Sequence, residues 1–135
     1  MGQCSSCLLN DPQVSSYQDT YTHLRERLKH QSLPVVIPLS DGTNLDCLFG
    51  LIRADGRRQF VLSTPDRIRQ IPLDDLTALL TTPDELQRVD TEATITADVF
   101  VALRLKKGNC VPIRFSDEDT RNIFIDLVRH LKPSI

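Results

Sequence analysis

The sequence predicts a mainly β domain with some α-helix: about seven short strands form a small barrel or sandwich, capped by one C-terminal helix. Three observations carry this prediction. Apolar residues alternate with others in short runs between residues 35 and 115, as half-buried strands require. Turn-forming Asp, Asn, Gly and Pro residues separate these runs. Residues 123–131 then carry one apolar helical stripe, which has to cover a surface.

The chain before the first strand divides into two segments. Residues 1–16 are small, polar and rich in serine, and we interpret them as a flexible N-terminal tail. Residues 17–31 carry a stripe at helical spacing among charged side chains, which predicts a short amphipathic helix or linker. The stripe consists of Tyr17, Tyr21, Leu24 and Leu28. Pro34 disfavours helical backbone at the residue before it and so predicts where the helix ends.

Residues 32–135 form the predicted folded domain. Its strands are expected over residues 35–39, 45–51, 57–63, 68–71, 76–80, 99–105 and 110–115. The Asp55-Gly56 pair is the hairpin signal between the second and third strands. A helix is the alternative for residues 76–80, because so short an apolar run does not distinguish the two.

Two helices complete the domain. Thr82 as N-cap, Pro83 at the first helical position and Glu85 as the partner in a capping box predict a helix of one or two turns. Ser116 is expected to cap the C-terminal helix, whose acidic first turn suits the helix dipole, and Pro133 is expected to end it. Strands in this order with a helix over their open end form the pleckstrin-homology architecture.

Composition and charge argue against several classes of protein. Lys and Arg total 16 against 18 Asp and Glu, a formal net charge of -2, whereas nucleic-acid binders carry a basic excess. No apolar run reaches the roughly 18 residues of a transmembrane helix, and we expect no secretory signal. The four cysteines are therefore interpreted as cytosolic thiols rather than as a disulfide framework.

The sharpest local signal is the N-terminal tip, MGQCSSC. After removal of Met1, Gly2 presents a free amine without a side chain, as N-myristoylation requires, and Ser6 occupies the position where Ser or Thr is preferred. One myristoyl chain holds a protein to a bilayer only marginally, with an association constant of about 10⁴ M⁻¹. Cys4 and Cys7 are placed to accept palmitoyl groups as the second signal, so the tip predicts dual acylation.

The spacing Cys4-x-x-Cys7 also occurs in redox motifs and zinc sites. A thioredoxin-type motif follows a strand, and none is expected before Cys4. A zinc site needs a second close pair of ligands, whereas Cys47 and Cys110 are far apart in the sequence. We interpret Cys47 as a buried apolar residue, and Cys110 as facing solvent or the C-terminal helix. With no nucleophile–base pair or phosphate loop either, we predict no enzyme and no catalytic, cofactor or metal site.

Headgroup-binding pleckstrin-homology domains usually place several Lys and Arg in and beside the first hairpin, because clustered phosphates require clustered cations. Here the corresponding turn, residues 40–44, contains an acid and no base. Arg57-Arg58 and Lys106-Lys107 lie on other turns, and we interpret both pairs as solvated tips. The sequence therefore argues against a specific phosphoinositide site.

An acylation tip followed directly by a compact pleckstrin-homology-like domain resembles the inner membrane complex sub-compartment proteins of apicomplexan parasites. The resemblance covers nearly the whole chain, through MGQCSSC, LSDGTNLDCLFGL, IRQIPLDDLTALLTTPDELQRVDT and KKGNCVPIRFSDEDTRNIFIDLVRHL. It implies a myristoyl group on Gly2 and palmitoyl groups on Cys4 and Cys7. It also implies a pleckstrin-homology-like domain that has lost headgroup binding and serves protein contacts.

The sequence thus predicts a noncatalytic scaffold or adaptor, held by acyl chains on the cytoplasmic face of a membrane. The resemblance places that membrane at the inner membrane complex. Protein partners are expected in the membrane–cytoskeleton layer, without nucleic acid and without a cofactor. The alternative is a phosphoinositide-binding module that selects its membrane through the barrel.

Overall fold

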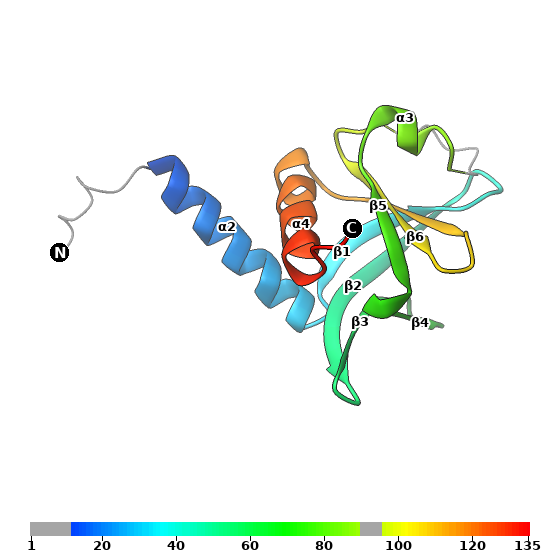
Figure 1. Cartoon of the computed structure of the whole chain (residues 1–135), viewed down its shortest axis with the longest axis horizontal. Coiled ribbons are helices and arrows are strands. Elements are labelled where there is room, and N and C mark those ends of the chain that lie inside the picture. The colour runs from blue at the N-terminus through cyan, green and yellow to red at the C-terminus, as the bar shows by residue number, and fades with distance from the viewer. Residues whose placement is uncertain (1–11, 90–95) are drawn as a thin grey trace.

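The computed structural model describes residues 12–89 and 96–135, in which two long helices lie next to each other on one side of a seven-stranded sheet (Figure 1). The elements are α2 (Pro12–Lys29), β1 (Leu33–Pro38), β2 (Asn44–Ala54), β3 (Arg57–Ser63), β4 (Ile68–Pro72), the 3-10 turn η1 (Leu73–Asp75), β5 (Leu76–Leu80), α3 (Pro83–Leu86), β6 (Phe100–Leu105), β7 (Cys110–Arg114) and α4 (Glu118–Leu131). The seven predicted strands are confirmed, and residues 76–80 form a strand rather than a helix.

The sheet consists of two antiparallel meanders joined in the middle, in the order β4-β3-β2-β1-β7-β6-β5. β1 pairs with β2 along six residue pairs but with β7 only through Val36 and Arg114. The two edge strands, β4 and β5, are consecutive in the chain and connected by η1, and they do not pair with each other. The sheet therefore folds over as an open sandwich, which confirms the predicted pleckstrin-homology-like fold class.

Local chemistry explains the hairpin and the short helix. Asp55 and Gly56 both have positive φ, 53° and 75°, as the two central residues of a type I′ turn require, and so they form the predicted β2–β3 hairpin. Thr82 accepts a hydrogen bond from the backbone N–H of Glu85 at 3.3 Å, and the Glu85 carboxylate accepts one from the backbone N–H of Thr82 at 3.1 Å. The predicted capping box is confirmed.

The core lies between the sheet and α4. Phe124 of α4 is fully buried, and its ring centroid lies 5.5 Å from Phe49, 6.0 Å from Phe60 and 4.9 Å from Phe115. Phe49 lies on β2 and Phe60 on β3, whereas Phe115 directly follows β7 of the other meander. The apolar stripe of α4 thus packs against both halves of the sandwich, and burial of its apolar area stabilises this packing.

Two cationic side chains fasten the ends of α4 to backbone carbonyls. Near its N-terminus, Arg121 donates from Nε to the Phe100 carbonyl at 3.1 Å and from Nη2 to the Thr81 carbonyl at 2.5 Å. After its C-terminus, Lys132 donates from Nζ to the carbonyls of Leu73 at 3.0 Å and Leu76 at 2.6 Å. Both contacts reach the β5 half of the sandwich.

The helix ends differ from the sequence predictions in three places. α2 begins at Pro12, five residues before the predicted start and inside the predicted tail; proline suits a first helical position. α2 ends at Lys29, two residues before the predicted end, because Gln31, with φ of 56°, turns the chain in a Schellman motif in which the Ser32 N–H donates to the Arg27 carbonyl at 2.9 Å. The N-cap of α4 is Asp117 rather than Ser116, because the Asp117 carboxylate accepts from the Thr120 N–H at 2.7 Å.

Candidate membrane-anchoring and partner-binding surfaces

The predicted acylation sites Gly2, Cys4 and Cys7 lie outside the residues that the structure describes. The described chain begins at Pro12, at the end of α2 that projects away from the sheet (Figure 1). The tail therefore joins the folded part through α2, which we call the arm, and not directly at the sandwich. No helix in the described part of the chain is long and apolar enough to span a bilayer.

The arm is attached to the sandwich along its C-terminal half. Leu24 and Leu28 are 4% and 1% exposed and belong to the same core as the sheet and α4. Nearer the N-terminus, Tyr17 donates a hydrogen bond from Oη to Oδ2 of Asp126 on α4 at 2.5 Å. That hydrogen bond, with smaller effects of burial and of the carboxylate's charge, raises the pKa of Tyr17 to about 12.

The first hairpin, between β1 and β2, carries a stabilised negative charge. Oδ1 of Asp41 accepts hydrogen bonds from the Thr43 backbone N–H at 2.9 Å and from its hydroxyl at 2.6 Å. These hydrogen bonds lower the pKa of the Asp41 carboxyl, so it is ionised at neutral pH. A carboxylate here repels phosphate groups, in line with the sequence argument against a headgroup site.

Exposed apolar side chains lie on β2 and β4. Leu45 is 39% exposed, although it alternates with the buried Cys47 on the same strand, because it lies near the end of β2, beside the first hairpin. Leu48 of β2 and Ile68 of β4 are 46% and 71% exposed, and both lie opposite Ser63 of β3. Residues directly opposite one another share a sheet face, so Leu48 and Ile68 form an exposed apolar row on the outer face.

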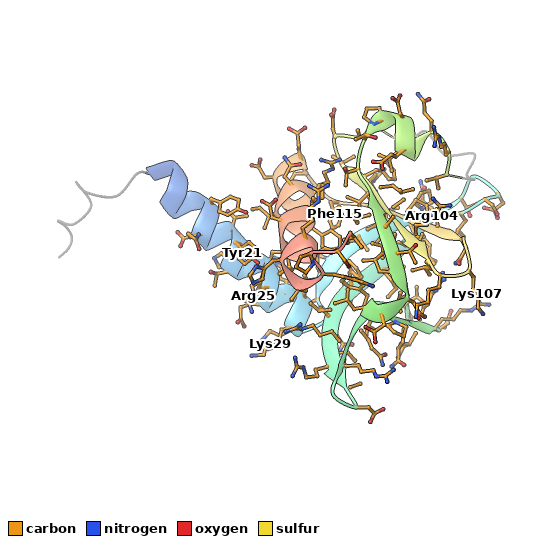
Figure 2. All side chains as sticks on the ribbon, viewed as in Figure 1. Tyr21, Arg25, Lys29, Arg104, Lys107 and Phe115 are labelled. Atoms are coloured by element: carbon orange, nitrogen blue, oxygen red, sulfur yellow. The ribbon has the colours of Figure 1, made fainter. Side chains whose placement is uncertain are left out.

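The basic turns differ from each other. Nζ of Lys106 lies 3.8 Å from Oδ1 of Asp75. Lys107 is exposed on the side of the molecule away from α2 (Figure 2). Arg57 and Arg58 are exposed, but Arg58 also lines a groove of about 560 Å³ that extends to α2. The sequence did not reveal this groove, because its walls come from segments that meet only in the folded chain.

The remaining reactive side chains have structural surroundings. Cys47 is buried, and this burial, with the nearby charge of Asp46, raises the pKa of its thiol. Cys110 is half-buried against a smaller apolar cluster that includes Leu86 of α3 and Phe100 of β6. Within residues 12–89 and 96–135, no group of three or more His, Cys, Asp or Glu could hold a metal ion.

Comparison with known proteins assigns the family. The family described as "ISP1 C-terminal" matches residues 23–130 of this chain. The chain belongs to that family. The family resemblance seen in the sequence is confirmed, although no curated protein matches.

Two solved structures are similar to this member of the ISP1 C-terminal family. Inner Membrane Complex Sub-compartment Protein 1 from Toxoplasma gondii is 39% identical, with a TM-score of 0.77 over 85% of this chain and 92% of that chain. Inner Membrane Complex Sub-compartment Protein 3 from Toxoplasma gondii is 17% identical, with a TM-score of 0.66 over 87% of this chain and 86% of that chain. The second similarity shows the shared fold.

Proposed function

We propose that this chain is a noncatalytic scaffold or adaptor of the inner membrane complex, held on the cytoplasmic face of a membrane by its acylated tail. Gly2 carries the myristoyl group, and Cys4 and Cys7 carry palmitoyl groups. The pleckstrin-homology-like domain contacts proteins rather than lipid headgroups. The observation that carries this proposal is the first hairpin, where an ionised Asp41 and the exposed Leu45 occupy the place at which headgroup binding requires cations.

Family membership supports the location, because both solved relatives are inner membrane complex sub-compartment proteins. The attachment of α2 to the sandwich supports anchoring of the domain through its acylated tail. Myristate alone gives reversible membrane contact, and added palmitate makes that contact stable. Because α2 is attached through Leu28 and the Tyr17–Asp126 hydrogen bond, the tail would hold the sandwich at one side rather than on a loose linker.

The experiment is fractionation and imaging of full-length variants. Gly2→Ala should move the protein to the cytosol, because it removes the myristate that brings the cysteines to the membrane. Cys4→Ser with Cys7→Ser should leave weak, diffuse membrane binding through myristate alone. Cys47→Ser is the matched control and should stay at the membrane, because Cys47 is buried.

The same variants distinguish the phosphoinositide-binding alternative. If the barrel selected the membrane, the Gly2→Ala protein would still pellet with membranes, and that result would contradict the anchoring proposal. Mass spectrometry of the native N-terminal peptide would identify the acyl groups directly. An unmodified Gly2 would contradict the proposal independently of location.

A further inference from the structure

A groove lies between α2, the β2–β3 hairpin and the C-terminal half of α4. Its volume is about 560 Å³. It lies at the Ala54 end of β2, whereas the first hairpin lies at the Asn44 end, so the two surfaces are at opposite ends of this strand. We call it the basic groove, and its main walls are Arg25, Lys29, Leu51, Arg53, Arg58 and Leu131.

Four cations surround this groove. Arg25 and Lys29 lie one turn apart on α2 (Figure 2), while Arg53 comes from β2 and Arg58 from β3. Arg25 lies 6.0 Å from the ring centroid of Tyr21, and among the described residues none of the four forms an ion pair. The single carboxylate of the lining, Glu26, lies 3.5 Å from His30. The groove therefore has an unbalanced positive charge.

The sheet register places two of these cations against each other. Arg53 and Arg58 are directly opposite in the antiparallel β2–β3 pair, so their side chains share one sheet face. Like charges in this position destabilise a sheet. An anion bound between them would remove that repulsion, and none of the ion pairs within residues 12–89 and 96–135 supplies one.

The floor of the groove is apolar. Leu51 and Leu131 are partly exposed in it, and the buried residues Leu28 and Leu127 also line it. A small anion bound by the cations at the rim would leave this apolar floor exposed to water. A carboxylate-bearing segment with large apolar side chains would use both the floor and the rim, because apolar burial and charge complementarity then act together.

We propose that the basic groove binds an acidic, amphipathic segment of a partner protein. Carboxylates of the segment lie between Arg53 and Arg58 and beside Lys29, and an apolar side chain covers Leu51. The tail of this chain does not have that chemistry, since residues 1–11 include one acid, Asp11. The inference rests on the proposed function only in taking the partner to be a protein.

The test is selection of random displayed peptides on unacylated full-length protein, followed by anisotropy titrations of a labelled selected peptide. The selected peptides should be acidic and contain large apolar residues. Arg53→Glu with Arg58→Glu should weaken binding about tenfold or more at low salt, because it reverses both facing charges. Arg67→Glu with Arg69→Glu is the matched control, with the same change in net charge on and just before β4, and should bind as the wild type does.

Three results would overturn the inference. Selection could yield no enriched peptides, or peptides without an acidic excess. The Arg53→Glu, Arg58→Glu protein could bind the selected peptide as tightly as the wild type while keeping its unfolding temperature. Phosphatidylserine vesicles could bind the unacylated wild-type protein but not the Arg53→Glu, Arg58→Glu variant. That result would assign the groove to a lipid surface. None of these results bears on Gly2 acylation, so the anchoring proposal fails or stands separately.

Discussion

Tyr17 makes a polar contact that fixes the outer part of α2 to α4. It lies on the surface, 40% exposed, yet its hydroxyl is committed to Asp126 on the neighbouring helix. The raised pKa of Tyr17 means that the protonated phenol is the form that fits this contact. Since the folded pKa exceeds the usual value of about 10, the contact contributes fully below about pH 10 and is lost as pH rises toward 12.

Asp126→Ala should therefore lower the pH at which Tyr17 ionises, because it removes both the hydrogen bond and the carboxylate. The measurement is tyrosinate absorbance in a Tyr21→Phe background, which leaves one tyrosine in a chain without tryptophan. Asp119→Ala, at an exposed position on the same helix, is the control and should leave the titration unchanged. An identical curve for Asp126→Ala and wild type would show that the contact does not form in solution.

At the scale of elements, α2 and α4 perform different tasks. α4 lies across the sandwich, and its Phe124 packs against Phe49 of β2 and against Phe115, which directly follows β7. Leu24 and Leu28 of α2 pack in the same core, and Gly50 of β2 leaves room for the turn that follows the helix. A Cβ at Gly50 would lie only 2.8 Å from the Gln31 Cα. We therefore propose that α2 folds as part of the domain and is more than a linker.

Leu28→Ala should lower the free energy of unfolding by about 3 kcal/mol, because it leaves a cavity where α2 packs on the core. Urea denaturation of full-length protein measures this change. Leu48→Ala is the matched control: the same atoms are removed at a position that is 46% exposed, so the change should stay near 0.5 kcal/mol. Equal denaturation midpoints for the two variants would show that α2 is not part of the folding unit.

For the molecule as a whole, we propose that the tail and the sandwich have separate functions. The tail selects the membrane, and the sandwich offers protein-contact surfaces at different places on its sheet. The exposed apolar row of Leu48 and Ile68 lies on the outer face and does not overlap the basic groove. Changes to that row should therefore alter partners without altering anchoring.

Leu48→Glu with Ile68→Glu should leave the protein in the membrane pellet. The double variant should lose some of the neighbouring proteins that proximity labelling detects in cells, which we call its set of neighbours. The glutamates would have to be desolvated at an apolar contact, which is unfavourable. Gln18→Glu with Gln87→Glu adds the same charge at two exposed sites elsewhere and should leave the set of neighbours intact. An unchanged set in the Leu48, Ile68 variant would exclude the row as a contact surface.

Most of the secondary structure could be predicted because its causes are local. The Asp55-Gly56 hairpin depends on two backbone conformations that these residues tolerate, and the Thr82–Glu85 capping box on hydrogen bonds between residues three apart. The cap of α4 was placed one residue too early because Ser116 and Asp117 are both good capping residues. Only the backbone course shows which side chain reaches the Thr120 N–H.

The sequence by itself determined the order of strands and helices, the acidic first hairpin and the acylation motif, because each depends on neighbouring residues. Only the tertiary structure decided that β1 meets β7, that Tyr17 reaches Asp126, and that the α2 cations Arg25 and Lys29 join Arg53 and Arg58 around one groove. These contacts join remote segments, and burial of the apolar faces of α2 and α4 brings them together. The charge of a groove lined by α2, β2, β3 and α4 cannot be read from any one of these elements.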